Sequence, residues 1–166
     1  MLLEISGEIT PQRIKRRSQS KNNTQLWMWL VMELKSNVCE EQYCIGTWNV
    51  RSMNQGKLKV VKQEMARVKV DILGISELKW TGMGEFNSDD HYIYYCGQES
   101  LKRNGVALIV NKRVWNAVLG YNLKNDRIIS VHFQGKPFNI TLIQVYARPV
   151  MLKKLKLNSS MKTYKI

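Results

Sequence analysis

CIGTWNVRS (residues 44–52) and ILGISELKW (residues 72–80) are the two segments that decide the fold. In each of them, an apolar run of strand length ends in polar residues. Between the two segments, apolar residues recur at helical spacing and lysines occupy the opposite face. We therefore expect strands at Tyr43–Trp48 and Ile72–Ser76, joined by an amphipathic helix that covers the sheet. A strand–helix–strand unit of this kind predicts a parallel pair of strands.

The pattern changes in the second part of the chain, where short β-rich runs follow one another. Turn-forming residues such as Asn104-Gly105 separate them. The runs are Tyr92–Cys96, Gly105–Val110, Ala117–Leu123, Arg127–Phe133 and Phe138–Tyr146. Consecutive short strands joined by tight turns predict an antiparallel meander. The predicted fold class is therefore α/β, an α+β sandwich with a mixed sheet and one covering helix.

The net charge of +13 over 166 residues is unevenly distributed. Residues 1–38 hold six Lys or Arg against three Glu, residues 39–147 fourteen against ten, and residues 148–166 six against none. We expect a basic, polar extension at 1–38, a folded unit at 39–147 and a disordered Lys-rich tail at 148–166. Basic ends are compatible with a polyanionic partner, but charge runs are commonly solvated tails, so the charge alone does not decide the function.

Cysteine usage and hydropathy point to a protein of a reducing compartment. The three cysteines form no Cys-x-x-Cys pair and no zinc-type cluster. The one apolar run, residues 26–34, is about half as long as the roughly 20 residues of a spanning helix, and Glu33 interrupts it. We expect no membrane association, and leave open a helix at 26–34 that lies at an interface or binds a partner.

Asn49 and Glu77 are the candidate chemical residues, because each directly follows a predicted buried strand. Side chains at such strand ends project into the place where α/β proteins hold ligands. A carboxylate and an amide there suit a hard cation and a phosphate oxygen. Two alternatives stay open. Asn49 could cap the following loop, and Lys79 could be an ordinary ion-pair partner of Glu77.

Four motifs resemble, in order, those of the endonuclease/exonuclease/phosphatase superfamily, which includes deoxyribonuclease I and the exonuclease III type of abasic-site endonuclease. They are GTWNVRS (46–52), DILGISELKW (71–80), NGVALIV (104–110) and QVYA (144–147). The resemblance is nearest to the endonucleases of RTE-type LINE retrotransposons and the craniofacial development protein 2-like proteins derived from them. It implies that residues 39–147 are the N-terminal half of a DNase I-like four-layer α/β-sandwich.

The resemblance also implies roles for individual residues. Glu77 matches the ligand of Mg²⁺ (or Mn²⁺), and Asn49 matches the residue that orients the carboxylates and the scissile phosphate. Tyr146 matches a tyrosine whose hydroxyl lies against that phosphate, and Lys79 a lysine near the metal-binding carboxylates. The implied reaction is metal-assisted hydrolysis of a phosphodiester, with DNA favoured over RNA as the substrate and the nucleus as the location.

The departures from the family pattern predict that this chain is inactive alone. Arg51 stands where related enzymes often have an acidic residue, and it could contact phosphate or have no role. No Asp-x-Asn motif or terminal Asp-His pair follows Tyr146, and His91 and His132 are expected to be structural. Loss of a general base alone costs roughly 10²- to 10⁴-fold in rate. The tryptophans are expected to pack in the core or rim, although Trp80 borders the site and could contact substrate.

Half of a two-sheet sandwich would expose an apolar sheet face and an open edge. We therefore expect exposed side chains that could support self-association, namely Tyr94, Leu108, Val110, Ile129, Val131, Ile140 and Leu142. Two other interpretations remain beside the inactive phosphodiesterase. One is a basic module that binds nucleic acid without cutting it, and the other is a retroelement-derived product with no function.

Overall fold

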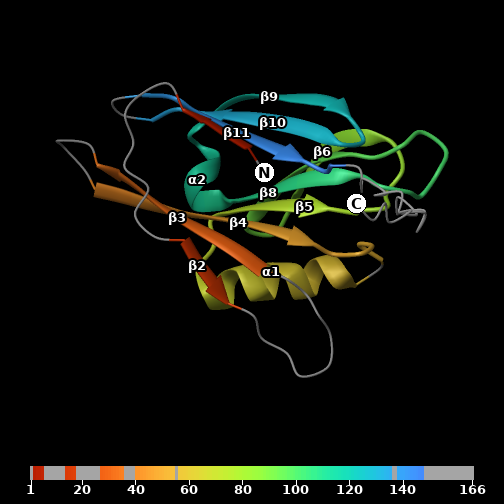
Figure 1. The fold of residues 1–166 in the computed structure, drawn as a ribbon, viewed down its shortest axis with the longest axis horizontal. Helices are drawn as coiled ribbons and strands as arrows, with labels where there is room; N and C mark the ends of the chain where they lie inside the picture. The colour runs from red at the N-terminus through yellow and green to blue at the C-terminus, as the bar shows by residue number, and fades with distance from the viewer. Residues whose placement is uncertain are drawn as a thin grey trace, which may run out of the picture.

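The computed structural model describes residues 2–5, 14–17, 27–35, 40–54, 56–135 and 138–147, with side chains from Tyr43 onward. Two stacked β-sheets and a helix on the outer face of the larger sheet form three layers (Figure 1). The seven-stranded sheet has the order β2-β3-β4-β5-β8-β7-β6, and the four-stranded sheet the order β1-β11-β10-β9. No helix in the described ranges is long and apolar enough to cross a membrane.

The larger sheet contains β2 (Ile14–Arg17), β3 (Trp27–Lys35), β4 (Glu40–Asn49), β5 (Ile72–Ser76), β6 (Met83–Ser88), β7 (His91–Cys96) and β8 (Val106–Asn111). The smaller sheet contains β1 (Leu2–Ile5), β9 (Val118–Asn125), β10 (Ile128–Phe133) and β11 (Ile140–Val145). The helices are α1 (Lys57–Val68) and the single turn α2 (Lys112–Trp115).

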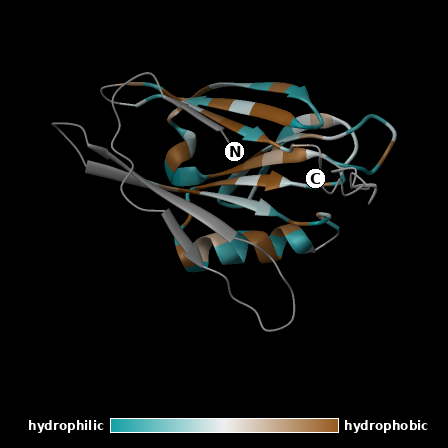
Figure 2. Ribbon diagram, viewed as in Figure 1, coloured by the Kyte–Doolittle hydropathy of each residue, from teal (hydrophilic) through white to brown (hydrophobic). Residues whose placement is uncertain are grey.

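The predicted strand–helix–strand unit is confirmed as β4, α1 and β5. β4 and β5 pair in parallel, with Asn49 opposite Ser76 at their carboxyl ends. The helix α1 buries Val61 and Met65, and Figure 2 shows hydrophobic and hydrophilic positions alternating along it. The helix begins after Gly56, whose φ of 85° lies in the left-handed region that glycine adopts without strain. One amphipathic face therefore covers the outer side of the sheet.

The predicted meander is divided between the two sheets. β7 and β8 continue the larger sheet, whereas β9, β10 and β11 form antiparallel pairs in the smaller one. The turn α2, which the sequence analysis missed, carries the chain from one sheet to the other, and the Asn111 side chain caps it by accepting from the Arg113 amide. β6 was also missed, since its sequence MGEFNS has no apolar run and alternates between exposed and half-buried positions at the sheet edge.

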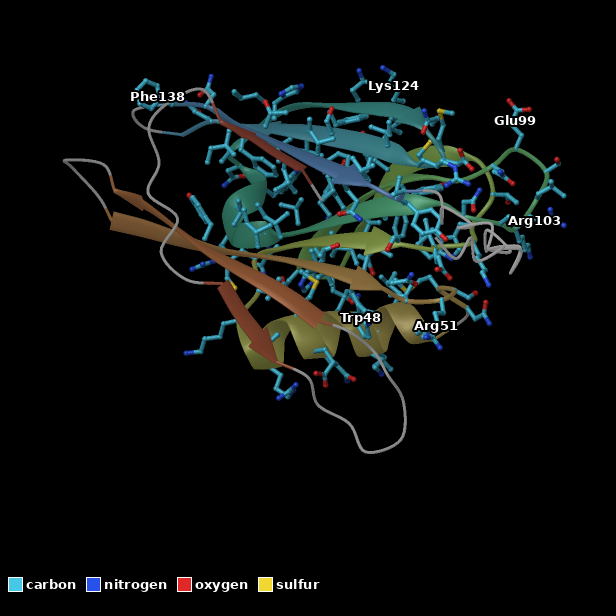
Figure 3. The ribbon with its side chains drawn as sticks, in the orientation of Figure 1. Trp48, Arg51, Glu99, Arg103, Lys124 and Phe138 are labelled. Atoms are coloured by element: carbon cyan, nitrogen blue, oxygen red, sulfur yellow. The ribbon has the colours of Figure 1, made fainter. Side chains whose placement is uncertain are left out.

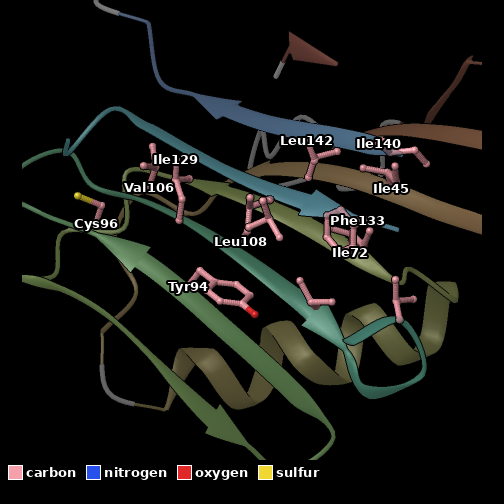
Figure 4. Close-up of a cluster of buried hydrophobic side chains, with 13 residues drawn as sticks. Ile45, Ile72, Tyr94, Cys96, Val106, Leu108, Ile129, Phe133, Ile140 and Leu142 are labelled. Carbon is pink, nitrogen blue, oxygen red and sulfur yellow. The ribbon is translucent and has the colours of Figure 1, made fainter. Parts of the chain in front are cut away.

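The expectation of an exposed apolar sheet face is wrong. The seven residues expected at this surface are all buried between the sheets, from Ile140 at 6% exposed to Leu142 at 0% (Figure 4). The reason is that β10 and β11 do not extend the larger sheet but pack face to face on β8 and its neighbours. These residues therefore offer no apolar surface for self-association.

Residues 27–35 also differ from the expectation. They form the strand β3, which pairs with β4 along its full length from Trp27 opposite Trp48 to Lys35 opposite Glu40. The interpretation of this segment as an interfacial or partner-binding helix is therefore wrong. The segment we set in the extension contributes a strand to the sheet, and the Lys-rich tail at 148–166 lies outside the described residues.

An ion pair between the buried Asp71 carboxylate and the exposed Arg113 side chain fixes β5 where it enters the sheet. Asp71, 5% exposed, accepts from the Cys44 amide at 2.8 Å and from the Arg113 guanidinium at 2.5 and 2.6 Å. The carboxylate thus joins β4, β5 and α2 through charge-assisted hydrogen bonds.

We expect Asp71→Ala to lower the free energy of unfolding by roughly 2–4 kcal/mol, because it removes a buried acceptor from a charged and a backbone donor. Chemical denaturation followed by circular dichroism measures this change. The matched control is Glu64→Ala on α1, since Glu64 and its partner Arg67 have side chains that are 32% and 61% exposed, and a surface pair contributes about 0–1 kcal/mol. Equal losses in the two variants would contradict the role assigned to Asp71.

Candidate active site

The carboxyl ends of β4 and β5 bring Asn49 and Glu77 into direct contact. The Asn49 Nδ2 donates to Glu77 Oε1 at 2.6 Å. The Val50 amide donates to the Ser76 carbonyl at 3.1 Å, which keeps the two strand ends together beyond the last paired residues. The sequence prediction that these two side chains lie at one sheet edge is therefore confirmed by the geometry.

Tyr146 reaches the same carboxylate from the other sheet. It directly follows β11, and its hydroxyl donates to Glu77 Oε1 at 3.2 Å. Burial raises the pKa of Tyr146 above its usual value, and the negative charge of Glu77 raises it further. A phenol that stays protonated can continue to donate to the carboxylate at neutral and mildly alkaline pH. Three candidates, taken from distant parts of the sequence, thus converge on one oxygen atom.

The backbone that presents Glu77 is held in an uncommon conformation. Glu77 and Lys79 have φ values of 56° and 60°, in the left-handed region that non-glycine residues seldom adopt. Backbone hydrogen bonds fix this segment: the Leu78 amide donates to the Gly105 carbonyl at 3.0 Å and the Lys79 amide to the Asn104 carbonyl at 2.7 Å. A Cβ at Gly105 would lie 3.1 Å from the Leu78 Cβ. The Asn104-Gly105 motif therefore supports the loop that carries Glu77, and such strain is common at functional sites.

The sequence left two alternatives open, Asn49 as a loop cap and Lys79 as an ion-pair partner of Glu77, and they have different outcomes. Asn49 does cap the following loop, since its Oδ1 accepts from the Arg51 amide at 3.0 Å, and its amide donates to Glu77 at the same time. The loop-capping alternative is therefore confirmed, and the same side chain also contacts Glu77. The ion pairs among the described residues do not include one between Lys79 and Glu77. The carboxylate is held by neutral donors, not by that lysine.

The remaining candidates surround this contact. Arg51 is exposed at the end of the molecule where β4 and β5 terminate (Figure 3). Lys79 and Trp80 are half-buried and line an open groove beside Glu77. The Trp80 Nε1 donates to the Met53 carbonyl at 2.7 Å and its ring packs edge-on against Tyr95. Trp80 is thus fixed by rim packing, as expected, and still faces the groove.

Comparison with known proteins identifies the family of this chain. The sequence model of the Endonuclease/Exonuclease/phosphatase family matches residues 46–155. The chain belongs to this family. It is 80% identical over 115 residues to craniofacial development protein 2 of Bos taurus, and 78% identical over 115 residues to the protein of the same name from Tragulus javanicus. Each match covers 69% of this chain but only 19% and 20% of the relatives, so the chain spans about a fifth of their length.

Two further residues support the contact between Asn49, Glu77 and Tyr146, and neither was predicted from the sequence as a site residue. The Arg127 guanidinium lies 5.3 Å from the centre of the Tyr146 ring, and its Nη1 donates to the Tyr146 carbonyl at 3.4 Å. Gln144 is 1% exposed and accepts from Thr47 Oγ1 at 3.4 Å. It fills the space above Gly74, where a Cβ would lie 2.1 Å from the Gln144 Oε1. A polar residue at an inward position of a strand was the available signal for Gln144.

The two histidines do not join this family site. His91 is buried at the start of β7, opposite Asn111, and burial lowers its pKa. His132 is exposed on β10, where its Nδ1 lies 2.9 Å from Thr141 Oγ1. Neither ring has a hydrogen bond to Asn49, Glu77 or Tyr146 among the described contacts. These positions are consistent with the structural roles expected for both residues.

The side chains of this site provide one ligand for a cation. Within the described ranges no three His, Cys, Asp or Glu side chains gather closely enough to hold a metal ion. Both hydrogen bonds to Glu77 end on Oε1, so Oε2 has no partner in the described part of the chain. Mg²⁺ is commonly held by one or two carboxylates together with waters and substrate phosphates. Glu77 fits one such ligand, and the rest of the coordination would come from water and phosphate.

We expect Glu77→Gln to lower the pKa of Tyr146, because the substitution removes a negative charge that disfavours the phenolate. Since the raised pKa favours the neutral phenol in the folded state, its contribution to stability is present below about pH 10 and is lost as the pH rises through the pKa. Carbon-13 NMR of the tyrosine Cζ atoms over an alkaline titration measures the midpoint, with Tyr146→Phe to assign the signal.

Glu85→Gln is the control for this titration. Burial and then Glu85 raise the pKa of Tyr121, so this variant is expected to lower the Tyr121 midpoint and leave that of Tyr146 unchanged. An unchanged Tyr146 midpoint in Glu77→Gln would contradict the contact between the two residues.

Proposed function

We propose that this chain carries one wall of a Mg²⁺-dependent phosphodiesterase site and that it does not cleave nucleic acid alone. The observation that supports the proposal most strongly is the convergence of Asn49 and Tyr146 on Glu77 Oε1, at 2.6 and 3.2 Å, from two different sheets. Two neutral donors on one oxygen orient the carboxylate and leave its other oxygen directed away from them. That is the arrangement expected of an oriented metal ligand.

Each residue would have a distinct task at this wall. Glu77 would hold the cation through its second oxygen, with Asn49 and Tyr146 fixing the rotation of the carboxylate. Arg127, stacked on Tyr146, would position the phenol. The chemistry that a divalent cation supplies when bound is neutralisation of the charge that develops on the phosphate during attack by water. Arg51 and Lys79 are the nearby cations proposed to attract the phosphate backbone of DNA.

We expect the chain alone to be inactive because its described residues place no general base at this site. Glu77 is the carboxylate of the site, and the described contacts place no second carboxylate or imidazole on it to accept a proton from water. A positioned general base contributes about 10²- to 10⁴-fold to the rate. One weakly ligated cation without that base is insufficient for measurable turnover.

Cation binding at Glu77 can be tested without turnover. We expect Mn²⁺, a paramagnetic substitute for Mg²⁺, to broaden the amide signals of residues near Glu77, and excess Mg²⁺ to restore them. Glu77→Gln should abolish this local broadening. The matched control Glu64→Gln, on the exposed surface of α1 where Glu64 pairs with Arg67, should leave it unchanged. Equal broadening in wild type and Glu77→Gln would refute the cation site.

Cleavage is tested separately with supercoiled plasmid. We expect no Mg²⁺-dependent nicking by the wild-type chain above the level of Glu77→Gln. Mg²⁺-dependent nicking that disappears in Glu77→Gln would contradict the proposed inactivity and show that the single wall suffices. The two measurements together distinguish an inert site from one that binds the cation without turnover.

A second function is supported by the charges around the site. Arg51, Lys79, Lys102 and Arg103 take part in none of the ion pairs found among the described residues. Arg51 and Arg103 lie at the same end of the molecule (Figure 3). Unpaired cations at one sheet edge favour a polyanion, so the chain could hold nucleic acid without cutting it.

A further inference from the structure

The groove beside Glu77 has a lining that, apart from Lys79, takes no part in the proposed phosphodiesterase site. Its walls come from the loop after β4, the loop after β5, the strands β6 and β7 and the segment before β8. It is open and has a volume of about 540 Å³. The lining residues used below are Lys79, Trp80, Phe86, Tyr95 and Lys102.

Three aromatic rings form one side of this groove. Trp80 lies 5.4 Å from Tyr95 and 5.9 Å from Phe86, and Phe86 lies 6.0 Å from Tyr95, measured between ring centres. All three are half-buried, whereas the apolar residues between the sheets are almost fully buried. Aromatic faces that remain accessible at a surface are suited to planar ligands.

The groove also carries positive charge that none of the described acidic residues pairs with. Lys79 and Lys102 both line it, and neither takes part in an ion pair with a described residue. Lys102 is exposed. Accessible rings next to unpaired cations are the combination found in sites for single-stranded nucleic acid, where bases stack on rings and cations contact phosphates.

The groove is built before any ligand arrives. The Trp80 indole donates to the Met53 carbonyl at 2.7 Å, and the Gly82 amide to the Gln98 carbonyl at 2.9 Å. Gly97 passes so close beneath the loop that a Cβ there would lie 1.9 Å from the Trp80 carbonyl oxygen. A fixed loop loses little conformational freedom on binding, which favours affinity.

We infer that this groove binds an unpaired nucleotide segment of single-stranded nucleic acid, with bases against the Trp80, Phe86 and Tyr95 rings and phosphates near Lys79 and Lys102. The inference deepens the proposed function, because it names the form of nucleic acid that the chain holds. It does not depend on a cation at Glu77. Duplex DNA, whose bases are stacked on one another, cannot present its base faces to these rings.

The experiment measures fluorescence anisotropy of labelled oligothymidylate with the full chain in EDTA, so that no cation contributes. The ligand controls are a duplex of the same length and an abasic oligomer with the same number of phosphates. We expect the oligothymidylate to bind more tightly than both, by roughly fivefold or more over the abasic oligomer, since one stacked base contributes at least that factor. Equal affinity for the abasic oligomer would overturn base stacking.

Two variants test the residues of the groove. Phe86→Leu keeps an apolar side chain and should weaken oligothymidylate binding while leaving abasic binding unchanged. Lys102→Gln, a surface change that does not threaten folding, should lower the slope of log affinity against log salt by about 0.7, the value for one phosphate contact on a single strand. Its control is Lys112→Gln, since Lys112 is exposed on α2 at the other end of the molecule (Figure 1).

The outcomes separate this inference from the proposed function. A salt slope that stays unchanged in Lys102→Gln would contradict nucleic-acid binding in the groove. Displacement of the oligonucleotide by polyglutamate at equal charge concentration would also contradict it. Glu64→Gln, on α1 and outside both sites, should bind oligothymidylate as the wild type does. If the wild-type chain binds oligothymidylate but shows no Mn²⁺ broadening near Glu77, only the cation site is refuted. If it shows the broadening but does not bind oligothymidylate, only the groove is refuted.

Discussion

The parallel pairing of β4 with β5 is the constraint on which the site depends. Parallel strands need a crossover, which α1 provides, and they end at the same sheet edge. Asn49 lies opposite Ser76, so the residue that follows Ser76 is placed beside it. The ion pair of the buried Asp71 carboxylate with Arg113 fixes the other end of β5. A short, doubly anchored strand leaves little freedom for the position of Glu77.

The contact between the two sheets completes the site. Gln144 occupies the hollow above Gly74, so β11 approaches β5 closely where both strands near their carboxyl ends. Tyr146 lies two residues further on, and its hydroxyl reaches Glu77 at 3.2 Å. A side chain larger than hydrogen at Gly74 would displace Gln144 and with it the end of β11. Packing between the layers, and not local sequence, therefore sets the position of the phenol.

The sequence predicts what depends on local periodicity and misses what depends on strand partners. The apolar runs correctly located β4, β5, β7 and β8, together with α1. They did not reveal which sheet each later strand joins, because alternation specifies a buried face but not what covers it. Ile129 and Leu142 were therefore expected to be exposed, although they lie between the sheets. Arg127 was missed for a related reason, since its stacking on Tyr146 arises only once β10 and β11 are paired.

The loop after β5 links the two proposed sites physically. Glu77 and Trp80 lie three positions apart, and the residues between them donate backbone hydrogen bonds to the carbonyls of Asn104 and Gly105. Because these bonds already fix the loop, a ligand seated against Trp80 and a cation on Glu77 would each meet a backbone that needs little further ordering. The strained backbone at Glu77 and Lys79 thus serves both the carboxylate on one side of the loop and the groove on the other.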